Sequence, residues 1–252
     1  MNEIRDLIIG IDIGKEYTQI CYYDRKAEEA RSLSMKVGAS QYEAPGCICY
    51  RSVQKDYCVG LEAEYFAREK GGIMVGNIYD ICRKEEAVQV AGEERKPAEL
   101  FSHFLREILK FLGIQDIVKN TKCLCITSPE LNAVQVRNYQ EACSLAGFPE
   151  EKYMLMDYGE SFYYYALGQK RETWNRSVGW YAFSGDTVDF RKLTINGASR
   201  PVLVKLEDPV STKLDPENEI RDVEFCRFVS KTLGKELFSS VQITGKGFDQ
   251  QW

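Results

Sequence analysis

The residues best suited to chemistry stand near the start of the chain, in the run Gly-Ile-Asp-Ile-Gly-x-x-x-Thr. Asp12 ends an apolar stretch, Gly14 lets the backbone approach an oxyanion closely, and Thr18 starts the return strand. The N–H groups of such a turn form an anion-binding concavity, and a carboxylate at a strand end holds a hydrated magnesium ion. Lys15 adds a positive charge. The run predicts a phosphate-binding hairpin with Asp12 as a water-mediated Mg²⁺ ligand; an ordinary hairpin with glycine at its turn is the alternative.

A second candidate segment covers residues 123–148. It reads Cys-Leu-Cys-Ile-Thr-Ser-Pro, then carries Asn132, Gln135 and Arg137, and ends with Ala-Gly-Phe. This order resembles the DnaK-type chaperone segment, in which a strand V-I-T-V-P-A precedes a helix that begins N-x-x-Q-R and ends A-G-L. The resemblance implies a nucleotide-binding domain of the actin, chaperone and sugar-kinase superfamily.

The resemblance continues through residues 160–168, Glu-Ser-Phe-Tyr-Tyr-Tyr-Ala-Leu-Gly, which are similar to the family's first connecting motif, E-P-T-A-A-A-x-A-Y-G. Glu160 takes the place of the family's glutamate if the alignment shifts by a single residue, and Gly159 occupies it otherwise. In the family this acid organises the metal and the attacking water, which makes Glu160 the candidate catalytic residue. A solvent-facing acid at a helix start is the alternative. The tyrosines at 163–165 replace small residues, so the packing of this helix must differ from the family's.

The family's second phosphate loop, D-L-G-G-G-T-x-D, is matched by residues 182–189, Ala-Phe-Ser-Gly-Asp-Thr-Val-Asp. The resemblance places Gly185, Asp186 and Thr187 among the nucleotide-binding residues. However, Ala182 replaces the leading aspartate, and the carboxylate of Asp186 would repel a γ-phosphate. Either Asp186 supplies the lost metal carboxylate from a new position, or the loop is a hairpin that no longer supports hydrolysis. The second interpretation is preferred.

A fourth landmark is the run Val-Gln-Ile-Thr-Gly-Lys-Gly-Phe at residues 241–248, which resembles the family's adenosine motif, V-x-L-x-G-G. The resemblance places Gly245, Lys246 and Gly247 against the nucleoside, although a tight turn at a strand end explains the glycines equally well. The four landmarks occur in the family's order. The stretch before this turn is too short for the helical subdomain with which chaperones hold adenine, so the second half is abridged.

The residue pattern predicts which strands and helices position these residues. A hairpin followed by β-α-β units begins at Leu7 and again near Val178, which indicates an α/β fold with two similar lobes. Strands are expected at residues 7–13, 18–23, 32–37, 47–51, 57–60, 123–127, 153–156 and 241–244 and on both sides of 184–186, and helices at 61–69, 97–112, 161–167, 222–233 and from the turn at 128–130 to about 146. The resemblance implies a two-lobed actin-like ATPase (ribonuclease H-like) fold with mixed sheets flanked by helices. Lobe I is expected over residues 1–170 and a reduced lobe II over 171–252, with the ligand between them.

Composition narrows the classes of function. The 33 basic residues against 38 acids give a formal charge of -5, which provides no basic field for a nucleic-acid backbone. Neither a secretion signal nor an apolar run near the roughly 20 residues of a membrane span is present, so we expect a cytoplasmic protein without membrane insertion. The chain contains 1 histidine, His103, and its 9 cysteines form no C-x-x-C pair. These counts disfavour a zinc site and a histidine-based catalytic triad.

Three functions remain open. The first is a chaperone-like or actin-like domain that binds ATP or ADP with Mg²⁺ and hydrolyses it weakly or not at all. The second is a noncatalytic interaction or scaffold protein on the same fold, with a protein partner. The third is a small-molecule kinase of the sugar-kinase branch, for which Asp157 is the candidate base.

Overall fold

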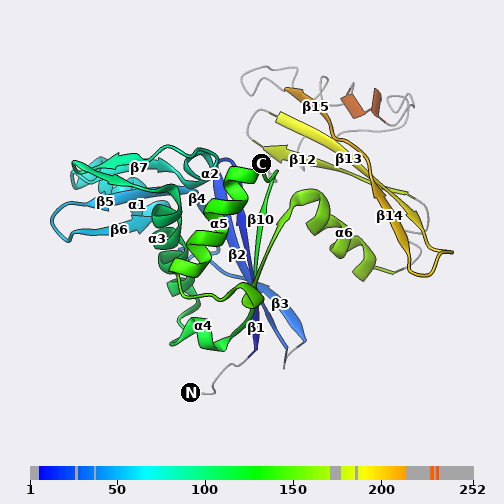
Figure 1. The fold of residues 1–252 in the computed structure, drawn as a ribbon, viewed down its shortest axis with the longest axis horizontal. Coiled ribbons are helices and arrows are strands. Elements are labelled where there is room, and N and C mark those ends of the chain that lie inside the picture. The colour runs from blue at the N-terminus through cyan, green and yellow to red at the C-terminus, as the bar shows by residue number, and fades with distance from the viewer. Residues whose placement is uncertain are drawn as a thin grey trace. The chain divides into compact units, whose positions relative to one another are not determined.

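The computed structural model of the chain describes residues 6–25, 28–36, 38–170, 177–184, 187–213, 228–229 and 231–232. The chain divides into two compact units, Met1–Tyr165 and Ala166–Trp252. Both units contain a sheet, and helices accompany the strands, so the fold is of the mixed α/β class (Figure 1). The division falls within helix α6 (Tyr158–Gly168), shortly before the end of the predicted lobe I.

The larger sheet of the first unit has a hairpin at its centre. Its strands are β1 (Leu7–Ile13), β2 (Tyr17–Asp24), β3 (Glu29–Ser32), β4 (Glu43–Pro45), β10 (Thr121–Ser128) and β11 (Tyr153–Asp157). Their order is β11-β10-β1-β2-β3, and β4 also pairs with β2. Strand β1 is antiparallel to β2 and parallel to β10, which is parallel to β11. The carboxyl ends of β1, β10 and β11 therefore meet at one edge of the sheet.

The strands predicted at residues 7–13, 18–23, 123–127 and 153–156 are confirmed, whereas the strand predicted at 32–37 is wrong. Strand β3 ends at Ser32. The hydroxyl of Ser34 then donates to backbone carbonyls of its own loop, including that of Lys36 at 2.9 Å. A serine that bonds to nearby backbone favours a turn over continued strand pairing, so the chain leaves the sheet here.

One face of this sheet is the main core. In β1 the residues Leu7, Ile9, Ile11 and Ile13 are buried and alternate with partly exposed positions, as expected of a strand with one covered face. Helices α3 (Pro97–Leu109) and α5 (Ala133–Leu145) belong to this core and lie side by side (Figure 1), with the rings of Phe101 and Tyr139 4.4 Å apart. The helix predicted at 97–112 is confirmed, with its last turn as a 3-10 helix, Lys110–Leu112.

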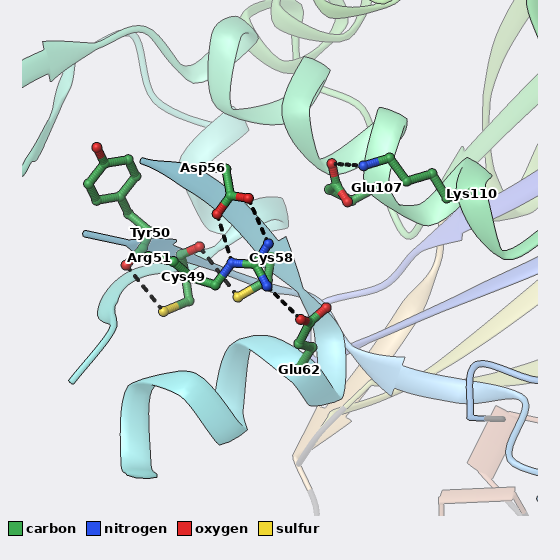
Figure 2. Close-up of polar contacts among 8 residues, drawn as sticks. All are labelled: Cys49, Tyr50, Arg51, Asp56, Cys58, Glu62, Glu107 and Lys110. Atoms are coloured by element: carbon green, nitrogen blue, oxygen red, sulfur yellow. Dashed lines mark hydrogen bonds and ion pairs between the residues drawn. The ribbon is translucent and has the colours of Figure 1, made fainter. Parts of the chain in front are cut away.

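A smaller sheet follows β4. It consists of β5 (Cys47–Arg51), β6 (Asp56–Val59) and β7 (Ile73–Asn77) in the order β6-β5-β7, with helix α1 (Gly60–Glu69) after β6. Arg51 makes two hydrogen bonds of 2.7 Å to the carboxylate of Asp56, and a third of 2.7 Å reaches Glu62 on α1 (Figure 2). These bonds raise the pKa of Arg51 and lower that of Asp56. The bidentate pair joins β5 to β6 within the hairpin, and the bond to Glu62 ties the hairpin to α1.

The remaining elements of the first unit are short. They are α2 (Ile78–Cys82), β8 (Val88–Val90), β9 (Glu93–Arg95), α4 (Ile117–Asn120) and a 3-10 helix at Glu150–Lys152. His103 lies in α3, where its ring is 4.5 Å from that of Tyr57 and burial lowers its pKa. All described cysteines are free thiols. Within the described ranges, none of the helices combines the length and apolarity that a membrane span requires.

The second unit contains a separate antiparallel sheet. Its strands are β12 (Ser177–Ser184), β13 (Thr187–Asn196), β14 (Leu203–Leu206) and β15 (Val210–Lys213). Both β14 and β15 pair with β13, and Val188, Phe190 and Phe228 form a small core beside Tyr181. Of the helix expected at 222–233, residues 228–229 and 231–232 are described and helical. The strand expected at 241–244 lies outside the described residues.

Candidate functional site

The turn between β1 and β2 requires glycine at position 14. The Gly14 N–H donates to the carbonyl of Tyr17 at 3.0 Å, and the flanking residues Ile13 and Thr18 are paired. A Cβ on Gly14 would stand 2.8 Å from the Tyr17 oxygen and 3.4 Å from the hydroxyl of Tyr158. The turn is therefore closed by a backbone contact that no other residue permits without displacement.

This turn is also held from outside. The carbonyl of Glu16 accepts a 2.7 Å hydrogen bond from the N–H of Gly46, and that of Lys15 accepts a 2.9 Å bond from the side-chain amide of Asn77. The Thr18 hydroxyl donates to the carbonyl of Asp12 at 2.6 Å, and Thr18 is buried. The hydroxyl predicted to reach a ligand is thus engaged inside the hairpin, and the turn is a rigid feature of the fold.

Asp12 lies at the carboxyl end of β1, and its carboxylate faces two hydroxyl groups. Thr127 on β10 donates to it at 3.3 Å, and Tyr158 at the start of α6 also hydrogen-bonds to it. Burial nevertheless raises the pKa of Asp12 from 3.8 to about 6, although the two hydrogen bonds work in the opposite direction. No lysine or arginine of the described chain forms an ion pair with Asp12. A desolvated acid without a counter-charge is a candidate for binding a cation.

A buried polar network fixes the strand end that carries this acid. The Ser128 hydroxyl donates to the carbonyl of Ile13 at 2.9 Å, and the side-chain amide of Gln135 donates to Ser128 at 3.2 Å and to the Tyr139 hydroxyl at 2.9 Å. Asn132 caps α5 by accepting the N–H of Gln135 at 2.7 Å. In the sequence, Asn132 and Gln135 were only markers of a family segment. The structure gives them a role: Asn132 caps α5, and Gln135 links this helix through Ser128 to the end of β1.

Glu160 and Asp157 do not share the position of Asp12. Glu160 is exposed in the first turn of α6, and its N–H donates to the Asp157 carboxylate at 2.8 Å, so Asp157 serves as a helix cap. In the strand register Asp12 pairs with Thr127, which pairs with Met156. Asp157 is one residue further and therefore falls on the opposite face of the sheet. The candidate base of a kinase reaction is thus not oriented with the candidate metal ligand.

The other predicted residues belong to the second unit. Thr187 opens β13 and pairs with Ser184. Ala182 pairs with Asp189, whose carboxylate accepts a 2.5 Å bond from the Ser211 hydroxyl. The predicted site residues Gly185, Asp186, Gly245, Lys246 and Gly247 lie outside the described residues. Of the predicted nucleotide-binding residues that the structure describes, Asp12, Gly14, Lys15 and Thr18 lie in the β1–β2 hairpin, and Thr187 lies in the second unit.

Sequence reasoning missed Thr127, Ser128 and Tyr158 as parts of this site. They come from β10 and α6, which lie far from Asp12 in the chain. A usable signal existed, because the carboxyl ends of neighbouring parallel strands converge, and the polar pair Thr127 and Ser128 ends the predicted strand at 123–127.

Residues 29–252 match the model of a family described as "Family of unknown function (DUF5716) C-terminal". The chain belongs to this family. No curated protein matches it. The DUF5716 match begins at Glu29, the first residue of β3, so the β1–β2 hairpin with Asp12 and Gly14 precedes the matched region. The network of Ser128 and Gln135, in contrast, lies within it.

Proposed function

We propose that the β1–β2 turn and the adjoining strand ends bind the polyphosphate of ATP or ADP, with Mg²⁺ held through water by Asp12. The observation that carries the proposal is the state of Asp12, a desolvated carboxyl with a pKa of about 6 and no ion-pair partner among the described residues. The glycine turn that follows Asp12 in the chain also contains Lys15. A divalent cation would supply the missing charge and bring phosphate oxygens to the turn.

The sheet topology supports an actin-like, ribonuclease H-like lobe for this function. A central antiparallel hairpin continues into two parallel strands, and each of these is reached through helices. Ligands of such sheets bind beyond the carboxyl ends of the parallel strands, which is where Asp12 lies. A chaperone-like or actin-like domain that uses ATP would work in the cytoplasm, where ATP is abundant.

We expect hydrolysis to be weak or absent. Ala182 stands where the second phosphate loop of the family carries aspartate, and Glu160 is exposed in its helix. Phosphoryl transfer depends on positioned charges around the γ-phosphate, and each missing carboxylate removes one of them. The protein would therefore act as a nucleotide-dependent switch whose output is a change of conformation.

Calorimetric titration of the chain with Mg-ATP and with Mg-ADP tests the proposal. Binding should be saturable, should weaken when EDTA removes Mg²⁺, and should raise the melting temperature. At a ligand concentration of about 100 times Kd the stabilisation should reach about 2.7 kcal/mol. Asp12→Asn should abolish the magnesium dependence. Absence of both heat and melting shift at millimolar nucleotide rejects the proposal.

One observation favours a second candidate, a noncatalytic interaction protein on the same fold. The Tyr158 hydroxyl hydrogen-bonds to Asp12 and approaches Gly14, so it fills space over the turn that a ligand would need. In this case a protein partner would bind equally well with and without nucleotide. Tyr158→Ala distinguishes the candidates, since it should strengthen nucleotide binding if the turn is a phosphate site and leave partner binding unchanged if it is not.

A further inference from the structure

A surface groove of about 630 Å³ lies beside the candidate phosphate turn, within the first unit. One wall is the turn itself, a second is helix α1, and a third is strand β7. The side chains that give this groove its character, called the β7 groove below, are Glu16, Tyr17, Gln41, Cys47, Glu64 and Met74. Such a volume accommodates several side chains of a bound segment.

Strand β7 is an edge strand of its sheet, and its residues Met74, Gly76 and Asn77 line this groove. It is the last strand in the order β6-β5-β7, and within the described ranges it pairs only with β5. Its residues Ile73 and Met74 are 38% and 42% exposed, and Tyr17 across the groove is 51% exposed. An open edge with exposed apolar side chains is a template for pairing with another extended segment.

The charges of the β7 groove indicate which segment fits. The charged side chains that line it are Glu16 and Glu64, and no ion pair neutralises either of them in the described part of the chain. A partner with lysine or arginine would meet complementary charge here. Because side chains alternate along a strand, its basic residues would share the face of the glutamates and of Met74, and the intervening apolar residues would lie on the opposite face, that of Ile73.

We propose that the β7 groove binds an extended segment of a partner protein, with alternating basic and apolar residues, as an added strand on β7. Hydrogen bonds link the β7 groove to the turn between β1 and β2. Asn77 at the end of β7 bonds to the carbonyl of Lys15, and Gly46 at the groove floor bonds both to Glu16 and, through its own carbonyl, to the N–H of Ile78 at 2.7 Å. Partner binding therefore changes the affinity of the turn for nucleotide, a coupling that rests on the proposed function.

The binding step is tested with a fluorescein-labelled peptide of alternating lysine and valine, followed by fluorescence anisotropy with the full chain at about 0.15 M salt. A peptide of the same composition in lysine and valine blocks controls for charge alone, and a glutamate-valine peptide controls for its sign. The alternating peptide should bind about tenfold more tightly than either control.

Matched variants separate the groove from the general negative charge of the protein. Glu16→Gln combined with Glu64→Gln should weaken binding about tenfold. Glu150→Gln combined with Glu151→Gln removes equal charge from an exposed site elsewhere and should leave binding unchanged. Equal losses in the two double variants, or equal binding of the alternating and block peptides, overturn the proposal. So does a self-associated chain that the peptide converts to monomer, since a second copy would then be the natural occupant.

The coupling is tested by titrating Mg-ATP with and without saturating peptide. The dissociation constant of the nucleotide should change when the peptide is bound. The dissociation constant of the peptide should change by the same factor when the nucleotide is bound. If both ligands bind and neither changes the affinity of the other, the coupling is wrong and the peptide site is unaffected. If the peptide binds and nucleotide does not, the proposed function is rejected, whereas the proposal that the β7 groove binds a partner segment is supported.

Discussion

In each unit of the chain, the second strand of a hairpin carries two further short strands, one toward each end. Strand β2 pairs with β4 through residues 17–19, next to the turn, and with β3 through residues 21–24. Strand β13 pairs with β15 through residues 187–190, again next to the turn, and with β14 through residues 193–196. The hairpins expected at Leu7 and near Val178 therefore share one plan of strand pairing, whereas most of the helix and the strand expected to close the second copy lie outside the described residues.

The two hairpins differ where chemistry would occur. Between the paired residues Ile13 and Thr18 the chain has room for the turn that begins with Gly14, whereas only Gly185 and Asp186 separate Ser184 from Thr187. One residue before the last pair of the hairpin, the first unit has Asp12 and the second has Phe183. The same strand plan thus carries a candidate anion site in one unit and lacks its carboxylate in the other. Turn length and one acid, more than strand arrangement, determine the candidate function.

Shortening the first turn to the length of the second should have the largest effect. Deletion of Lys15 and Glu16 removes the carbonyls that accept from Asn77 and Gly46. At about 1 kcal/mol for each bond, with a further penalty for the unpaired partners, the free energy of unfolding should fall by about 3 kcal/mol. Nucleotide binding should be lost, as judged by calorimetry. A shortened variant that still binds Mg-ATP would show that the longer turn is irrelevant to the ligand.

Gly14→Ala tests the backbone contact that closes the same turn. The new Cβ would stand 2.8 Å from the carbonyl oxygen of Tyr17, which is backbone and cannot move cheaply. We expect a loss of about 2 kcal/mol in urea unfolding and weaker nucleotide binding. Gly168→Ala in α6 is the matched control, because a Cβ there meets nothing within 4 Å. A control variant that is as unstable as Gly14→Ala would contradict the role of the contact.

The sequence predicted the elements whose pattern is strong in itself. The alternation from Leu7 to Ile13 and the apolar stripe that begins after Pro97 gave the bounds of β1 and the start of α3. Strands β7, β8, β9, β14 and β15 were not predicted. They are short, and β7 contains a glycine, so their pairing depends on neighbouring strands more than on their own residues.

The candidate site was predictable only in its local part. Asp12 and Gly14 stand two residues apart, and a strand-turn pattern is enough to associate them. Thr127 and Tyr158 reach Asp12 only because β10 pairs in parallel with β1 and α6 follows β11. This register is a tertiary property, so the sequence could not show that two hydroxyls surround the carboxylate. For the same reason it could not show that Asp157 falls on the other face.

Asp12→Asn should stabilise the protein while it removes the candidate metal ligand. The folded-state pKa of Asp12 is raised from 3.8 to about 6, so the folded protein holds a proton that the unfolded chain releases. This contribution to stability is complete below pH 3.8 and is lost as the pH rises through 6. The variant should therefore match the wild type near pH 4 and exceed it by at most about 3 kcal/mol at pH 7.5. Urea unfolding across this range measures the difference, and Glu150→Gln, which removes an exposed charge, should show no such trend.

The smallest effect is expected from Tyr158→Phe, which isolates one hydrogen bond to the carboxylate of the first hairpin. That bond favours the ionised form of Asp12, so its loss should move the pKa upward from about 6 by roughly 0.5–1 unit and cost about 1 kcal/mol of stability. Carboxyl-carbon NMR titration, with Asp12 assigned from the Asp12→Asn spectrum, measures the shift. Tyr181→Phe in the second hairpin loses a comparable 2.8 Å bond to Thr232 and provides the control. The two variants should lose similar stability while only Tyr158→Phe shifts Asp12; an unmoved titration in both would mean that the Tyr158 hydroxyl does not act on the acid.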